Sequence, residues 1–233
     1  MKLIRPAGAY WKVAHRGASA LAPENSLAAI EAALAAGVDF VELDVIRAGD
    51  ELRIAHSLRQ LVPNSPTLNE ALALFAAQSA ARLDLDLKTS GVERPVLEAL
   101  AAHDLLGRTL VTSFHQEILR TVRRLEPQAV TGVSYPNDSL GLSRRRPLAP
   151  LVRPGLSLLR CALPFRIGRM VAGAQADAAM LHHALVTSEV VARCHAAGAA
   201  VFAWTLESRQ DLRRVLAAGA DGAIADDPGI FAE

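Results

Sequence analysis

The sequence has few cysteines and no excess of either charge. Its 233 residues include two cysteines, Cys161 and Cys194. Two cysteines are too few for a disulfide scaffold, and their spacing does not match a zinc site. The formal net charge is +1, from 25 Lys and Arg against 24 Asp and Glu. Because a nucleic-acid-binding surface is usually strongly basic, we expect no nucleic-acid partner.

The sequence also lacks an unbroken apolar segment long enough to cross a bilayer. No long apolar run typical of an export signal occurs near the N-terminus. Four arginines interrupt the most apolar later stretch, residues 148–171: Arg153, Arg160, Arg166 and Arg169. Such a stretch does not form a transmembrane helix. We therefore expect a soluble, cytoplasmic protein.

Half of the sequence is hydrophobic, as in a folded globular protein. Hydrophobic residues make up 51% and charged residues 21%, which excludes a disordered chain. No linker-like composition divides the sequence. An α/β barrel has roughly 250 residues, so one barrel would use almost the whole chain. We predict a single domain over residues 1–233.

A short pattern of an Ala-rich helix, a glycine and an apolar strand recurs along the chain. It occurs around Gly37, Gly198 and Gly219. A glycine directly after a helix is typical of a left-handed helix cap, and a short apolar run after it indicates a buried parallel strand. Eight strands are recognised in this way, at residues 12–15, 40–45, 81–88, 109–114, 129–135, 178–183, 200–205 and 221–226. Their alternation with helices predicts a (β/α)8 TIM barrel, an α/β fold.

A ninth short run, Leu52 to His56, follows the second strand after a turn at residues 48–51. No helix fits between the two runs, so we predict a β-hairpin excursion rather than a barrel strand. Thr67 and Glu70 have the spacing of a capping box and mark the start of the next helix. Only residues 57–66 separate the hairpin from this helix, and we therefore predict no sizeable insertion domain.

The stretch from Asn137 to Asp177 mixes basic and apolar residues and includes three consecutive arginines, residues 144–146. We interpret it as one or two barrel helices with a long loop after the fifth strand. The alternative is a surface that contacts lipid, because basic apolar helices can lie on membranes. This alternative predicts peripheral contact with a membrane.

Carboxylates alternate with apolar residues on the second and third strands. Glu42 and Asp44 share one face of the second strand, and Asp86 and Lys88 face inward on the third. Neighbouring strands are about 4.8 Å apart, so the three carboxylates converge. Carboxylates this close must take up protons or bind a cation, and oxygen ligands favour one divalent ion, Mg²⁺ or Ca²⁺. The alternative is a salt-bridged cluster whose charge Arg16 and Lys88 neutralise.

Two histidines end strands beside these carboxylates. His15 closes the first strand and His56 closes the hairpin, which fits a general base and a general acid near neutral pH. The positive charges of Arg16 and Lys88 suit a phosphate group. Trp204, at the end of the seventh strand, either packs on an apolar part of the substrate or lies at the rim. Together these residues predict a metal-assisted phosphoryl-transfer enzyme.

Short motifs along the chain resemble those of glycerophosphodiester phosphodiesterases. In order they are His15-Arg16-Gly17, Pro23-Glu24-Asn25, Glu42-Leu43-Asp44, His56, Asp86-Leu87-Lys88, Ser113-Phe114, Trp204-Thr205, Asp221-Gly222 and Asp226-Asp227-Pro228. Each motif is weak alone, but the ordered set extends from Val13 to Pro228.

The resemblance implies a TIM barrel that hydrolyses glycerophosphodiesters to glycerol 3-phosphate and an alcohol with one divalent cation. Carried over by position, it implies an acid–base pair (His15 and His56), metal ligands (Glu42, Asp44 and Asp86) and phosphate-binding residues (Arg16 and Lys88). It also implies a cyclic phosphate intermediate, formed by the neighbouring glycerol hydroxyl and opened by water. The substrate is then a small phosphodiester.

Three departures from the family pattern change the expectations. Asp86 replaces the usual Glu, as in the related spider-venom phospholipase D enzymes. His56 is followed by Ser57 rather than the usual Asp, so the expected orienting partner is absent. The family's insertion after this histidine is missing, which predicts a more open mouth. We therefore keep two alternatives, a lysophospholipase D-like enzyme and an inactive phosphate- or lipid-binding barrel. The sequence does not set the oligomeric state.

Several polar residues have less specific interpretations. Glu24 and Asn25 are expected to shape the start of the first helix, with Asn25 as its cap, or to assist at the phosphate. Asp84 is expected to support the metal ligands or pair with an arginine. Among the histidines, we expect His182 or His183 to line the pocket. We expect the remaining three at the surface: His103, His115 and His195.

Overall fold

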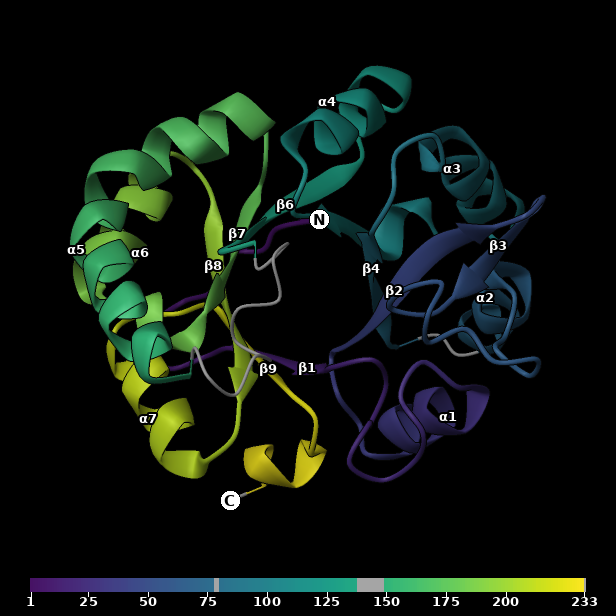
Figure 1. Cartoon of the computed structure of the whole chain (residues 1–233), viewed down its shortest axis with the longest axis horizontal. Helices are drawn as coiled ribbons and strands as arrows, with labels where there is room; N and C mark the ends of the chain where they lie inside the picture. Colours follow the sequence, from purple (N-terminus) through teal and green to yellow (C-terminus); the bar gives the residue numbers. More distant parts are fainter. Residues whose placement is uncertain (78–79, 138–148, 233) are drawn as a thin grey trace.

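The structure, a computed structural model, describes residues 1–77, 80–137 and 149–232, with side chains from residue 155 onward in the last range. Within these residues, eight parallel strands close into a barrel surrounded by helices (Figure 1). The barrel strands are β1 (Trp11–Ala14), β2 (Phe40–Ala48), β4 (Arg82–Leu87), β5 (Thr109–Ser113), β6 (Val130–Tyr135), β7 (Ala178–His182), β8 (Ala200–Leu206) and β9 (Gly222–Ala225). Because β1 pairs in parallel with both β2 and β9, the ring is closed and the predicted TIM barrel is confirmed.

The helices of the described residues lie outside the strands. They are α1 (Leu27–Ala35), α2 (Leu68–Ala76), α3 (Glu93–Ala102), α4 (Gln116–Leu125), α5 (Ala149–Ala174), α6 (Ser188–Ala196) and α7 (Arg209–Ala217), with short 3-10 turns η1 (Leu106–Arg108), η4 (His183–Leu185) and η5 (Pro228–Phe231). Thr67 caps α2 in a reciprocal capping box with Glu70, as predicted. After α1, Gly37 adopts a left-handed conformation with φ 68°, which a residue without a side chain adopts at little cost.

The additional strand β3 (Glu51–Ile54) pairs antiparallel with β2 and lies outside the ring. Its register joins Val45 to Ile54 and Ala48 to Glu51. The predicted hairpin is therefore confirmed. It carries His56 back toward the mouth of the barrel, where Ala55 N–H donates to the Asp44 carbonyl at 3.0 Å.

The basic apolar stretch contains one long helix, α5, within the described residues. Its inner side contributes Leu163, Ile167 and Val171 to the main hydrophobic core. The three arginines at 144–146 lie outside the described residues. In the described part of the chain, none of the helices combines the length and apolarity that crossing a bilayer requires.

The barrel separates two hydrophobic layers. Outward-facing strand residues such as Leu83, Leu85 and Leu87 pack under the helices. A second cluster, which includes Phe40 and Phe202, fills the inside of the barrel. Because strand residues alternate between faces, Asp84, Asp86 and Lys88 point inward between the leucines, as the sequence predicts.

Candidate active site

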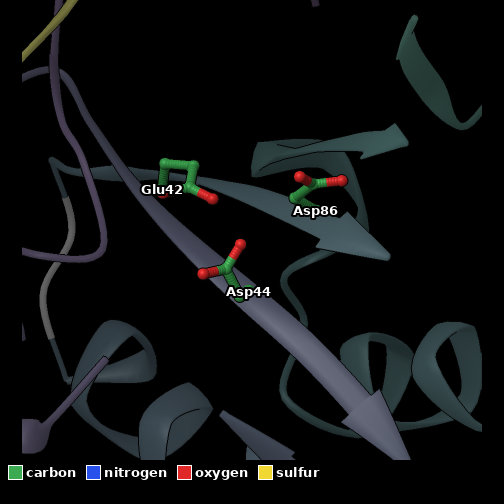
Figure 2. Close-up of side chains that lie close together, drawn as sticks. All are labelled: Glu42, Asp44 and Asp86. Atoms are coloured by element: carbon green, nitrogen blue, oxygen red, sulfur yellow. The ribbon is translucent and has the colours of Figure 1, made fainter. Parts of the chain in front are cut away.

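Three carboxylates converge at the C-terminal ends of β2 and β4. The parallel register places Glu42 beside Asp84 and Asp44 beside Asp86. Glu42, Asp44 and Asp86 are all buried, and one ligand oxygen from each lies within 4.8 Å of the others. Figure 2 shows the three side chains pointing toward one another from the two strands. The structure thus brings together the three residues that the sequence predicts as metal ligands.

Two basic side chains partly neutralise this cluster. Lys88 Nζ lies 2.5 Å from Asp44 Oδ1 and also contacts Asp86 Oδ2. Arg16 Nε lies 3.1 Å from Asp44 Oδ2. Burial alone would raise the pKa of Asp44, but Lys88, His56 and Arg16 lower it well below its usual range. Asp44 is therefore ionised, and the salt-bridged arrangement weighed from the sequence is present in the structure.

The charge of the cluster is only partly compensated. Oδ1 of Asp86 is buried and has no hydrogen-bond partner among the described residues. Burial and the nearby charge of Asp44 raise the pKa of Glu42 to about 7. A carboxylate that resists ionisation and a buried oxygen without a donor both indicate room for more positive charge. The donor set, three carboxylates and no sulfur, fits a hard divalent cation.

His15 is oriented by a carboxylate from the far end of the chain. Its Nδ1 lies 2.7 Å from Asp226 Oδ1, and its Nε2 lies 3.9 Å from Glu42 Oε2. Because the Asp226 carboxylate accepts a hydrogen bond, it holds a proton on Nδ1. Burial would lower the pKa of His15, but the hydrogen bond to Asp226 and the charge of Glu42 raise it. Sequence reasoning assigned no role to Asp226, although it ends the strand next to His15.

His56 has partners despite the missing Asp at position 57. Its Nδ1 lies 3.2 Å from Asp44 Oδ2 and 3.1 Å from Arg16 Nη2. One nitrogen cannot accept a proton from Arg16 and donate one to Asp44 at the same time. A His56 ring that carries a proton on Nδ1 donates it to Asp44, whereas an unprotonated Nδ1 accepts from Arg16. The expectation that His56 lacks an orienting group is therefore wrong.

The loop after β1 holds Arg16 in a left-handed conformation, with φ 54°. In this conformation its backbone N–H donates to Glu42 Oε2 at 2.8 Å, and its side chain bonds Glu24 Oε2 at 2.7 Å. The next residue, Gly17, lies so close to α1 that a Cβ there would come within 2.6 Å of the Ala29 backbone. A glycine is therefore required for α1 to pack beside the site.

Asn25 supports the site rather than capping the first helix. Ser26 is the N-cap of α1, and its hydroxyl accepts from the Ala29 N–H at 3.1 Å. Asn25 Nδ2 donates to Asp44 Oδ2 at 2.8 Å, and Asp44 N–H donates to Asn25 Oδ1 at 3.1 Å. The prediction of Asn25 as the cap is wrong, because its amide satisfies both the backbone and the side chain of Asp44.

A cavity of about 680 Å³ opens above these residues. Its lining includes the polar residues His15, Arg16, Glu42, His56, Asp86 and Lys88 and the apolar side chains of Phe114, Pro136, Met180, Trp204 and Ile224. Trp204 packs edge-on against Phe114, with ring centroids 5.9 Å apart. The cavity thus offers charged groups for a phosphate and apolar side chains for the rest of a substrate.

Two of the less specific expectations differ from the structure. Neither His182 nor His183 is among the described residues that line the cavity. His183, the first residue of η4, instead lies 3.2 Å from Asp211 and 2.8 Å from Arg214 of α7. His115, expected at the surface, is exposed but also lines the cavity. It lies two residues after the end of β5, and that position beyond a strand end was the available signal.

Asp84 lies one layer deeper than Asp86 and has no arginine partner among the described residues. Its Oδ1 accepts a hydrogen bond from the Thr112 hydroxyl at 2.7 Å. Burial, followed by the charge of Glu42, raises the pKa of Asp84 well above its usual range. Its carboxyl group therefore resists ionisation more than an ordinary aspartate does, and it lines the cavity beneath Asp86.

Comparisons with known proteins agree on one family. The model of the glycerophosphoryl diester phosphodiesterase family matches residues 15–61 and 66–230. A glycerophosphodiester phosphodiesterase from Caldanaerobacter subterraneus is 25% identical over 255 residues, covering 93% of each chain.

Solved structures share the fold. A putative glycerophosphoryl diester phosphodiesterase from Silicibacter pomeroyi matches with a TM-score of 0.76 at 23% identity, covering 97% of this chain and 92% of its own. A phosphodiesterase from Oleispira antarctica, solved in complex with the product sn-glycerol-3-phosphate, matches with a TM-score of 0.70 at 22% identity, covering 94% and 93%.

Proposed function

The chain belongs to the glycerophosphoryl diester phosphodiesterase family and is a phosphodiesterase of that class, and we propose that it hydrolyses glycerophosphodiesters to glycerol 3-phosphate and an alcohol by histidine acid–base catalysis. The observation that carries the proposal is the cavity in which His15 and His56 flank the carboxylates of Glu42 and Asp86. Both histidines have a hydrogen-bonded partner on Nδ1, as expected for rings that must present one nitrogen to a substrate.

One divalent cation, Mg²⁺ or Ca²⁺, belongs to this proposal. Glu42, Asp44 and Asp86 would hold it, since their oxygens converge and the buried Oδ1 of Asp86 has no donor among the described residues. A bound cation supplies positive charge beside the phosphoryl oxygens. Lys88 shares these carboxylates and keeps the cluster from being fully repulsive when no cation is bound.

The two histidines exchange protons with the substrate. One takes the proton of the neighbouring glycerol hydroxyl, whose oxygen then forms a bond to phosphorus. The other gives a proton to the leaving alcohol oxygen as its bond to phosphorus breaks, which produces a cyclic phosphate. In the second step a water oxygen forms a bond to phosphorus as it loses a proton to the histidine that acted as acid. A ring P–O bond breaks as its oxygen gains a proton from the other histidine. Both histidines end in their starting states.

The remaining cavity residues bind and orient. Arg16 and Lys88 supply fixed positive charge for the phosphate, and both line the cavity. Trp204 and Phe114 form an edge-on pair in the cavity lining, where they can contact the uncharged part of the substrate.

A second candidate is a lysophospholipase D-like activity on lysophospholipids. Leu58 and Val62, in the connection after His56, are 65% and 58% exposed, and Leu21, in the loop after β1, is 63% exposed. Gln60 Nε2 donates to Glu24 Oε1 at 3.0 Å and joins these two loops. An apolar rim next to the catalytic histidine suits an acyl chain.

The test is hydrolysis of glycerophosphocholine and of lysophosphatidylcholine, each with EDTA, Mg²⁺ or Ca²⁺, measured by choline release. We expect cation-dependent release from glycerophosphocholine. Release from the lysolipid alone would transfer the assignment to the second candidate. No release from either substrate, with cation binding intact, would contradict both and indicate a binding protein or another headgroup.

A further inference from the structure

The helix α5 (Ala149–Ala174) carries only positive charge. Its 26 residues include four arginines and no Asp or Glu. Figure 1 shows α5 on the outside of the barrel, next to α6. Three of these arginines are exposed among the residues with described side chains: Arg160, Arg166 and Arg169. Such a one-sided charge on an outer helix is complementary to an anionic surface.

Three arginines on other outer helices have carboxylate partners. Arg123 of α4 pairs with Asp177 at 2.5 Å, Arg193 of α6 with Glu189 at 3.6 Å, and Arg214 of α7 with Asp211 at 3.1 Å. Within the part of the chain that the structure describes, no ion pair involves Arg166 or Arg169. Their charge therefore remains available to a partner outside the chain.

The same helix exposes two large apolar side chains. Leu158 is 72% exposed and Phe165 is 75% exposed, the two highest values among the exposed large hydrophobic side chains of the described residues. They are seven residues apart, which places them on one face, two turns from each other. Arg169, four residues after Phe165, continues that face. The buried residues Leu163 and Ile167 lie on the opposite side, against the core.

We infer that this outer face of α5 binds the surface of an anionic lipid bilayer. An interfacial helix needs apolar side chains that enter the acyl boundary and basic side chains that contact the headgroups, and α5 offers both on one exposed face. The helix lies along the membrane and does not cross it, because its arginines and its packed inner face exclude a spanning arrangement.

A second copy of the chain is a less suitable partner for this face. A two-fold contact would place the face against itself and bring the arginines of both copies together without a carboxylate on the helix to balance them. Headgroup phosphates balance that charge directly. The inference concerns where the chain binds and not what it hydrolyses, so it can fail while the proposed function stands.

The test is sedimentation of the full chain with two kinds of vesicle at low salt. One kind contains phosphatidylcholine alone, and the other contains phosphatidylcholine with about 30 mol% phosphatidylglycerol. We expect binding only to the anionic vesicles. The double substitution R166Q/R169Q should lower the partition coefficient by about 25-fold, because each arginine near an anionic surface changes it by about fivefold. Phe165→Gln should weaken binding as well, whereas Phe165→Leu should retain it.

The matched control is R193Q/R213Q, which removes two exposed arginines from α6 and α7 and changes the net charge by the same amount. It should bind almost as the unmodified chain does. Equal losses in the two double variants, or no binding to anionic vesicles, would overturn the inference. A dimer in light scattering that Phe165→Gln dissociates, without vesicle binding, would assign the face to a second copy instead. Turnover of soluble glycerophosphocholine, measured in parallel, tests the proposed function separately.

Discussion

The two ends of the barrel interior are built on the same strands but have opposite chemistry. Along the inward face of β2, Phe40 is followed by Glu42 and Asp44. Near the N-terminal ends of the strands, Trp11, Phe40 and Phe202 form a chain of edge-on rings with centroid distances of 5.4 and 6.1 Å. At the C-terminal ends of the strands, the inward-facing positions carry charged side chains instead. Within four residues of one strand the interior changes from a packed core to the candidate active site.

This difference assigns stability to one end and chemistry to the other. Burial of aromatic rings stabilises the folded chain. Burial of Asp44, Asp86 and Lys88 carries a desolvation cost that their mutual attraction at best offsets. Substitutions near the N-terminal ends of the strands should therefore change the free energy of unfolding. Substitutions at the mouth of the barrel should change catalysis and cation binding.

The largest effect should come from the apolar end. Phe202 is fully buried inside the barrel, and Phe202→Ala should lower the free energy of unfolding by about 3–5 kcal/mol because it leaves a large cavity. Urea denaturation measures this change. Phe165→Ala, at a side chain that is 75% exposed, is the matched control and should change stability by less than about 0.5 kcal/mol. Equal effects at the two positions would contradict the packing described for Phe202.

At the mouth, His56→Ala should lower turnover by more than about 100-fold, because it removes a general acid–base group. The free energy of unfolding should change little, since the ring is partly exposed. Steady-state kinetics with urea denaturation of the same variant separates the two effects. His103→Ala, at the C-terminal cap of α3, should leave turnover unchanged. A tenfold or smaller loss for His56→Ala would remove His56 from the mechanism.

Cation binding should distinguish two aspartates on one strand. Asp86→Asn removes a charged ligand and should weaken Mg²⁺ or Ca²⁺ binding by at least about tenfold. Asp84→Asn makes the same change two residues away, but Asp84 is not part of the converging cluster of carboxylates and its pKa is raised well above its usual range. The cation affinity of this variant should therefore stay close to that of the unmodified chain. Isothermal titration calorimetry measures both. Similar affinities for the two variants would mean that Asp86 is not a ligand.

The smallest effect concerns the pH dependence of His15. Its pKa is raised in the folded chain, where burial, which lowers it, is outweighed by the hydrogen bond to Asp226 together with the charges of Glu42 and Asp44. The interaction of protonated His15 with Asp226 stabilises the fold below about pH 6.5, the pKa of His15 in the unfolded chain. This stabilisation is lost as the pH rises through the pKa of His15 in the folded chain. Asp226→Asn should therefore lower the pKa of His15, seen by NMR titration of the imidazole, and should destabilise the chain more at pH 5 than at pH 8. An unchanged pKa would show that Asp226 does not hold the ring.

Much of the site followed from local sequence. The alternation of residues along a strand has a period of two, so the inward positions of Glu42, Asp44 and Asp86 could be predicted without a structure. The capping box of Thr67 and Glu70 and the left-handed Gly37 were also predictable, because caps depend on a few neighbouring residues. The family motifs, spread along most of the chain, indicated the same fold.

Other features depend on the closed barrel. Asp226 lies 211 positions after His15 in the sequence and reaches it only because β9 pairs with β1. Asn25 bonds Asp44 only because the loop after β1 folds over the end of β2. Position within a strand fixes which way a side chain points, and the sequence alone determined that. Which carboxylate pairs with which basic side chain depends on distances between separate strands, and only the tertiary structure decided that.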